Sequence, residues 1–115
     1  MKVIIAGDRN IDNMDIVKSA IVKSRFHITE VVCGMCRGVD ILGRQWAIEN
    51  NIPVKEFPAN WSKFGRAAGP IRNREMAEYA DALIAILMPN SVGTKNMIQT
   101  AAKVGLKNVY IQRHG

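Results

Sequence analysis

Short runs rich in apolar and β-branched residues alternate along this chain with longer segments in which apolar residues recur at helical spacing. The pattern predicts five strands, over Lys2–Ala6, Thr29–Cys33, Pro53–Phe57, Ala82–Leu87 and Asn108–Gln112. It predicts four helices between them, over Asp12–Phe26, over Val39–Asn50, from Pro70 to about Ala80, and from just after Gly93 to about Val104. Strict alternation favours a mostly parallel sheet with helices on both faces. We therefore expect one Rossmann-like three-layer α/β domain over residues 1–115, with five mainly parallel strands.

Two prolines and one apolar run refine this expectation. Ala82–Leu87 is apolar throughout, which is typical of a strand buried on both faces. Pro53 opens the third strand and places it near an edge of the sheet. The segment Pro58–Gly69 is expected to be a loop, and Pro70 fits the first turn of the helix that follows it.

The composition is that of a globular protein. The chain has 115 residues, of which 48% are hydrophobic and 23% are charged, a size that suits one domain. No apolar run is long enough to span a bilayer. The first apolar run meets Asp8 and Arg9 at once, unlike a signal peptide. We therefore expect a cytoplasmic protein that has no membrane partner.

The charge balance is basic, with 16 Lys and Arg against 10 Asp and Glu, or +6. A basic surface favours phosphate-bearing partners. Six basic residues lie in or beside glycine-containing loops: Arg9, Arg37, Arg66, Arg72, Arg74 and Lys95. Because no run of consecutive basic residues occurs, a small phosphate-bearing ligand is favoured over long nucleic acid.

Three strand-to-helix junctions carry unusual residues: Gly7–Asn10, Cys33–Asp40 and Pro89–Lys95. In a parallel sheet these junctions share the edge at which ligands bind. Glycine allows close approach of the backbone, and a helix start offers free N–H groups to an anion. The junctions therefore predict a ligand that carries phosphate. The patterns G-x-G-x-x-G and G-x-x-x-x-G-K-[ST] are absent, which disfavours ordinary NAD-dependent hydride transfer and P-loop hydrolysis.

Two arginines of the predicted helix Pro70–Ala80 have different expected roles. Arg72 lies at the ligand-facing end of the helix, and we expect it to reach a phosphate as a solvated side chain at the pocket mouth, with Asn73 beside it. The alternative is an ordinary surface arginine. Arg74 has Glu78 four residues later, which predicts a surface ion pair.

Asp8, Asp40 and Trp61 each allow two interpretations. Either carboxylate could satisfy backbone donors at a helix start, or accept a hydrogen bond from a ribose hydroxyl. Trp61 could stack on a base, but packing on the core is favoured because tryptophan is largely buried on average. Trp46 lies on a helical apolar stripe and is expected in the core.

Cys33 and Cys36 form a C-x-x-C pattern, for which we favour ordinary reduced thiols over a redox pair. Zinc would need further ligands, and His27 and His114 are isolated in the sequence. We therefore expect no metal and no cofactor other than the ligand itself.

Several motifs resemble the YspA-like branch of the SLOG superfamily. They are Gly7-Asp8-Arg9, Cys33-Gly34, Gly38-Val39-Asp40, Trp46-Ala47, Asn60-Trp61, Gly93-Thr94 and the specific stretch from Ala68 to Met76. The resemblance implies a Rossmann-like fold that binds nucleotides or nucleotide-derived molecules, including those related to NAD and ADP-ribose. It also implies roles in nucleotide signalling, stress and phage–host conflict. Wider relatives include the LOG phosphoribohydrolases and the DNA-processing DprA proteins.

One departure bears on catalysis. LOG enzymes share a PGGxGTxxE stretch whose glutamate supports catalysis, and Met97 stands at that position here. Glu75 is a weak candidate to replace the missing carboxylate. We therefore favour a binding or sensor module over a phosphoribohydrolase, with DNA binding as a third hypothesis.

The expected ligand-binding residues come from these junctions and motifs: Gly7, Asp8, Arg9, Cys33, Gly34, Gly38, Asp40, Trp61, Gly69, Arg72, Asn73, Gly93 and Thr94. The expected partner is a nucleotide-derived small molecule, and assembly into a homo-oligomer is left open.

Overall fold

A computed structural model describes all residues from Met1 to Gly115. In chain order, its elements are β1 (Lys2–Gly7), α1 (Met14–Ser24), β2 (Glu30–Cys33), α2 (Val39–Glu49), β3 (Val54–Glu56), α3 (Trp61–Phe64), the 3₁₀ turn η1 (Gly65–Ala67), α4 (Ala68–Tyr79), β4 (Ala82–Leu87), α5 (Val92–Val104) and β5 (Asn108–Arg113).

The five strands form one sheet in the order β3-β2-β1-β4-β5, and every neighbouring pair is parallel. The predicted strands are all present, and β3 lies at an edge, as Pro53 indicated. The chain winds outward from β1 through β2 to β3 and then crosses to β4 on the other side of β1. Strand order therefore reverses between β1 and β4, which is where such folds bind ligands.

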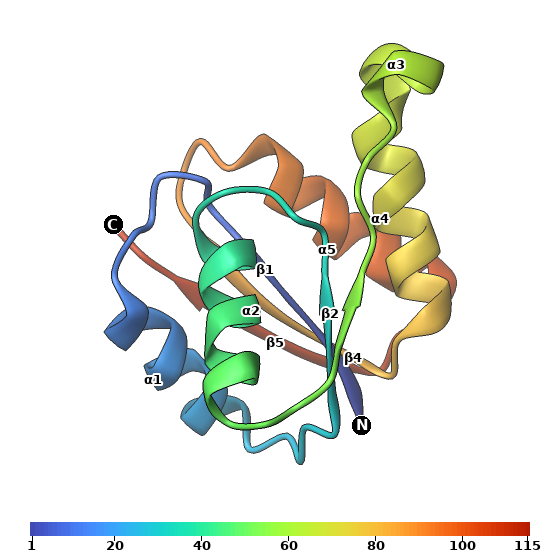
Figure 1. The fold of residues 1–115 in the computed structure, drawn as a ribbon. Coiled ribbons are helices and arrows are strands. Elements are labelled where there is room, and N and C mark those ends of the chain that lie inside the picture. Colours follow the sequence, from blue (N-terminus) through green and yellow to red (C-terminus); the bar gives the residue numbers. More distant parts are fainter.

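Helices cover both faces of the sheet, so the structure has the predicted three layers (Figure 1). On one face, Val17 of α1 and Val39 of α2 pack against the sheet within one hydrophobic cluster. On the other face, Met76 of α4 and Met97 of α5 belong to a second cluster. All six residues of β4 are buried, which confirms that it is a central strand. This fold is Rossmann-like.

The segment Pro58–Gly69 is not simply a loop, which corrects the expectation from sequence. It contains α3 and η1, and α4 begins at Ala68, two residues before Pro70. The Asn60 side chain caps α3 by accepting a hydrogen bond from the Lys63 backbone N–H at 3.1 Å. Pro70 still lies in the first turn of α4, where its missing N–H costs nothing.

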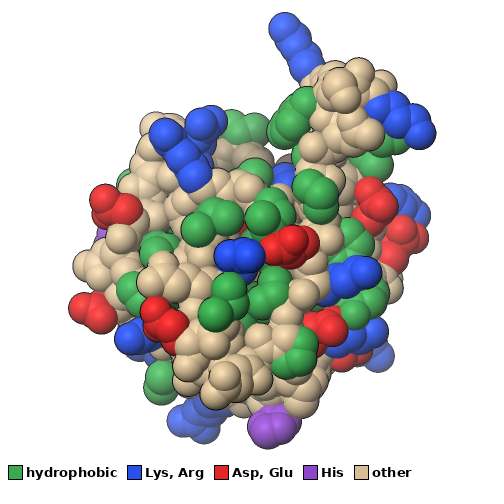
Figure 2. All heavy atoms as spheres, in the orientation of Figure 1, with side chains coloured by type: hydrophobic (Ala, Val, Ile, Leu, Met, Phe, Trp, Pro, Cys, Tyr) green, Lys and Arg blue, Asp and Glu red, His purple; other side chains and the backbone are tan.

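The short helix α3 stands away from the sheet beyond the start of α4 (Figure 1). Basic side chains extend from this projecting region (Figure 2), which carries Lys63 and Arg66. None of the helices combines the length and the apolar character that a membrane-spanning segment requires.

Candidate functional site

A pocket of about 590 Å³ lies at the carboxyl ends of β1 and β4, where the strand order reverses. It is lined by the turn after β1, the start of α4 and the loop that leads from β4 into α5. Ten of the residues expected from the sequence line it: Gly7, Asp8, Arg9, Asp40, Trp61, Gly69, Arg72, Asn73, Gly93 and Thr94. The fold therefore brings residues from separate motifs to one cavity.

Asp8 ties the turn after β1 to the loop after β4. Its Oδ2 atom accepts a 2.6 Å hydrogen bond from the Ser91 hydroxyl, and its Oδ1 atom accepts a 2.8 Å bond from the Asn10 backbone N–H. These two hydrogen bonds, led by that from Ser91, lower the pKa of Asp8 below its ordinary value. Asp8 thus satisfies a backbone donor of a turn and not of a helix start, because α1 begins at Met14 with Asn13 as its N-cap, and it carries a negative charge in the pocket wall.

Asp40 lies in the pocket lining near the start of α2 and is only 5% exposed. Burial raises its pKa to about 7, although the nearby positive charge of Arg72 and hydrogen bonds from the Cys36 and Gly7 backbone act in the opposite direction. Near neutral pH this carboxyl can therefore exist in both protonation states. The same side chain can accept a hydrogen bond from a ligand hydroxyl or transfer a proton.

Arg72 is not the solvated side chain that the sequence suggested, because it is only 7% exposed. Its guanidinium donates hydrogen bonds to the Gly34 carbonyl, to Asn73 Oδ1 at 3.0 Å and to Cys36 Sγ at 3.6 Å. The expectation failed because the loop after β2 folds over the start of α4 and covers the guanidinium. Arg72 still lines the pocket, so it both fixes this loop and presents positive charge to the cavity.

Gly34 lies between Arg72 and Asp40, outside the pocket lining. A Cβ atom there would come within 2.8 Å of Asp40 Oδ2 and 3.1 Å of Arg72 Nη1. Only glycine leaves room for both charged groups at this spot. Gly34 therefore makes room for the Asp40 carboxyl and the Arg72 guanidinium without lining the pocket, whereas we expected it to contact the ligand.

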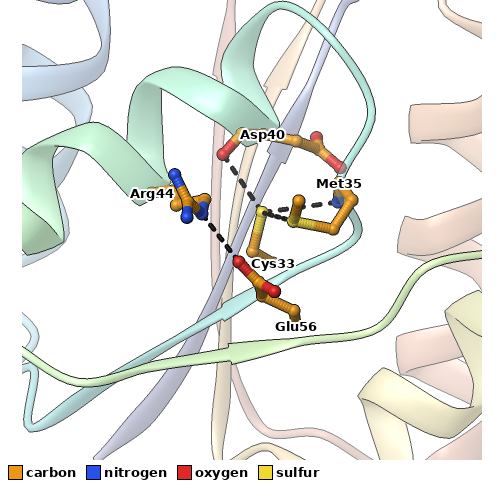
Figure 3. A network of polar contacts seen from close by, with 5 residues as sticks. All are labelled: Cys33, Met35, Asp40, Arg44 and Glu56. Carbon is orange, nitrogen blue, oxygen red and sulfur yellow. Dashed lines mark hydrogen bonds and ion pairs between the residues drawn. The ribbon is translucent and has the colours of Figure 1, made fainter.

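Cys33 and Gly38 also support the site from outside the pocket. The Cys33 thiol is fully buried and donates a hydrogen bond to the Asp40 backbone oxygen at 3.4 Å, while the Asp40 carboxylate points elsewhere (Figure 3). Burial raises the pKa of Cys33 to about 11, so this thiol stays protonated. Gly38 packs against the turn after β1, where a Cβ atom would come within 2.4 Å of the Asp8 carbonyl oxygen. Both cysteines are free, and Cys36 lines the pocket.

The start of α5 forms another wall of the pocket, beside α4. Lys95 Nζ donates a 2.6 Å hydrogen bond to the Pro89 carbonyl, which holds the loop before the helix. Gly93 and Thr94 occupy the first turn of α5, where backbone N–H groups have no partner within the helix. The space beside Gly93 is open for at least 4 Å around an added Cβ. This wall can therefore accept an anion directly on backbone donors.

Trp61 does not pack into the core, which corrects the favoured interpretation. It is 58% exposed and lines the pocket from α3. Trp46, by contrast, is partly buried and packs against the core cluster beneath α1 and α2, as expected. Sequence alone could not separate the two because no local pattern indicates that α3 projects from the sheet.

Several lining residues were missed from the sequence: Ala6, Asn10, Cys36, Arg66, Pro70, Met76, Asn90, Ser91, Val92, Asn96 and Met97. A signal existed for Asn90, Ser91 and Val92, since they fall within the third junction. Asn96 lies three residues after Gly93 and so shares its helix face. Its Oδ1 accepts a 2.8 Å hydrogen bond from Asn73 Nδ2, which joins α5 to α4 beside the cavity.

The pocket contains two carboxylates, Asp8 and Asp40. Glu75, the weak catalytic candidate, is exposed on α4 and does not line the pocket. Met97 lines it and is 1% exposed, so no carboxylate takes the place of the LOG glutamate at that position.

Residues 1–64 match the family described as "YspA, cpYpsA-related SLOG family". The chain belongs to this family. Membership in the YspA-related SLOG family fits a nucleotide-related binding role or a role similar to that of the LOG enzymes. The matched residues include the first two junctions, which supply Asp8, Arg9 and Asp40 to the pocket.

The chain is also similar to the Gene 61 protein of Mycobacterium phage D29. The two sequences are 34% identical over 82 residues, which cover 66% of this chain and 66% of the phage protein. The chain therefore matches slightly less than two thirds of that relative's length. No solved structure matches the chain.

Proposed function

We propose that the protein binds a nucleotide or nucleotide-derived molecule in this pocket and acts as a binding or sensing module. The observation that carries the proposal is one cavity of about 590 Å³ that brings together the first turn of α5, Arg9 and the buried carboxyl of Asp40. That volume suits a drug-sized or nucleotide-sized ligand. Membership in the SLOG family supports the same class of ligand.

Two regions of the pocket suit two parts of a nucleotide, its phosphate and its ribose. A phosphate fits the first turn of α5, because the Gly93 and Thr94 backbone N–H groups and the helix dipole all favour an anion there. Arg9 is exposed at the adjacent rim and adds a fork of donors. The buried Asp40 carboxyl is placed to accept a hydrogen bond from a ribose hydroxyl.

Gly93→Asp is a direct test of the phosphate position. The open space at Gly93 admits the side chain, and an acidic residue in the first turn favours the helix by about 0.3–1 kcal/mol. The same charge repels a phosphate, so affinity for AMP and ADP-ribose should fall by about tenfold or more. Calorimetric titration measures affinity, and thermal unfolding verifies that the fold is intact.

Gly93→Asn is the matched control because it adds similar bulk without charge. It should retain most of the affinity. Equal losses in the Asn and Asp variants would place the phosphate away from α5. An absence of binding by wild-type protein to AMP, ADP-ribose and NAD would refute the proposal for these classes.

Hydrolysis of an N-glycosidic bond is the second candidate function, and the raised pKa of Asp40 is the observation that favours it. A carboxyl that titrates near neutral pH can act as a general acid. Incubation with nucleoside monophosphates followed by chromatography for free base tests this activity. If base is released, Asp40→Asn should abolish the release, and release by the variant would exclude Asp40 as the acid.

A further inference from the structure

Trp61 presents an exposed aromatic ring at the mouth of the pocket. We propose that this ring is the platform on which the base of the nucleotide stacks, so that the pocket selects base-bearing ligands over simple ribose phosphates. The inference rests on the proposed function and adds a specificity-determining residue to it.

The position of Trp61 is fixed by local structure. The Asn60 side chain accepts hydrogen bonds from Lys63 N and from the Ser62 hydroxyl, at 3.1 and 3.0 Å, and so holds the turn on which the ring is mounted. The ring edge lies close to Gly69, with Trp61 Cη2 3.4 Å from where a Cβ would be. Trp61 is therefore held against the start of α4 instead of swinging freely in solvent.

The exposure of this ring calls for an explanation. Leaving apolar area in water is unfavourable, and apolar surface that lines a cavity is available to a ligand. Trp61 is 58% exposed although it lines a pocket, and Val92 of α5, which lines the same pocket, is 79% exposed. Of the two, only Trp61 has a flat ring on which a base can stack, and Val92 adjoins the phosphate position at Gly93.

The position of the anion-binding groups in the pocket predicts the orientation of the bound nucleotide. The anion-binding start of α5 is one wall of the pocket, whereas Trp61 comes from α3 beyond the start of α4. A nucleotide with its phosphate on Gly93 and Thr94 would direct its base toward the α3 side. Arg66 also lines the pocket there, and its guanidinium can lie over a base.

Phe64 provides a matched control within the same short helix. It is 40% exposed but does not line the pocket. Its ring lies under Lys63, with Nζ 5.1 Å from the ring centroid. If α3 acted only through folding or general surface properties, substitution of either aromatic residue would alter ligand binding. Stacking on the base requires Trp61 alone.

The test compares AMP with ribose 5-phosphate by calorimetric titration. Trp61→Ala should weaken AMP binding by about 5- to 100-fold, the range for loss of one stacked base, and should leave ribose 5-phosphate binding unchanged. Trp61→Phe should restore most of the AMP affinity, while Trp61→Leu, which is apolar but has no π face, should not. Phe64→Ala should leave the affinities for AMP and for ribose 5-phosphate unchanged.

Tryptophan fluorescence gives an independent readout. AMP should quench the wild-type emission, and the quenching should disappear in Trp61→Phe, which retains Trp46. Unchanged AMP affinity in Trp61→Ala, or equal losses for AMP and ribose 5-phosphate, would overturn the stacking role while leaving the phosphate site intact. Failure of wild-type protein to bind either compound would instead overturn the proposed function, and the stacking inference with it.

Discussion

The Ser91 hydroxyl lies 2.6 Å from Oδ2 of Asp8, across the point at which the strand order of the sheet reverses. Ser91 Oγ also accepts a 3.0 Å hydrogen bond from the Met88 backbone N–H, so one hydroxyl closes the loop after β4 and joins it to the turn after β1. The two walls of the pocket are thereby fixed relative to each other.

Ser91→Ala should destabilise the protein at neutral pH. It removes the hydroxyl that most lowers the Asp8 pKa and leaves the carboxylate with one fewer donor. The expected loss in the free energy of unfolding is about 1 kcal/mol, below the usual range of about 1.5–3 kcal/mol for charged hydrogen bonds, because the carboxylate faces an open pocket. Urea denaturation measures it.

The pH dependence of that loss has a definite sign. The Asp8 pKa is lowered in the folded state, so its contribution to stability is present above the unfolded value of 3.8 and is lost as the pH falls through the folded pKa. The difference in stability between wild type and Ser91→Ala should therefore shrink below about pH 4. A difference that grows on acidification would contradict this account.

Arg72→Ala should destabilise the protein strongly, because the buried guanidinium holds the Gly34 carbonyl and lies near Asp40. Loss of one buried charge that has such partners typically costs about 3 kcal/mol or more. Thermal and urea unfolding measure the effect. Arg74→Ala is the control, since its pair with Glu78 is an exposed contact at 3.6 Å, and the change should stay within about 0.5 kcal/mol. Similar effects of the two substitutions would mean that the burial of Arg72 contributes little.

Gly38→Ala and Gly65→Ala separate backbone strain from steric overlap. Both glycines have positive φ, +86° and +56°, but a Cβ at Gly65 meets nothing within 4 Å while one at Gly38 overlaps the Asp8 carbonyl. Gly65→Ala should cost about 1 kcal/mol from strain alone. Gly38→Ala should cost roughly 3 kcal/mol or more and displace the turn after β1. Equal costs in denaturant unfolding would show that this turn adjusts freely.

Asp40 should make stability fall as the pH rises toward neutrality. Burial raises its pKa to about 7 from an ordinary 3.8, so the folded protein holds a proton that the unfolded chain releases between these values. The stabilising contribution of the protonated carboxyl is complete below the unfolded pKa and is lost as the pH rises through the folded one. The free energy of unfolding of wild type relative to Asp40→Asn should therefore decrease from about pH 4 to about pH 7 and level off above it. A flat difference would show that Asp40 titrates normally.

Much of the fold could be predicted from the sequence because its determinants are local. The unbroken apolar run Ala82–Leu87 identifies a strand buried on both faces, and all its residues are buried in the structure. The three glycine-containing junctions point to one edge of the sheet because parallel strands all end there. Asp8, Arg9, Gly93 and Thr94 could be grouped on that ground alone.

Tertiary structure alone decided how the site is built. Arg72 is buried because the carbonyl of Gly34, 38 residues earlier in the chain, accepts its hydrogen bond, and no local pattern reports a partner at that separation. The raised pKa of Asp40 likewise follows from its burial, which outweighs the opposing effects of Arg72 and of the Gly7 backbone, and the sequence does not show either residue as a neighbour of Asp40. Trp61 is exposed because α3 projects from the sheet. Periodicity and turn residues fix the elements, whereas the dielectric surroundings and partners of each side chain depend on which distant segments pack against it.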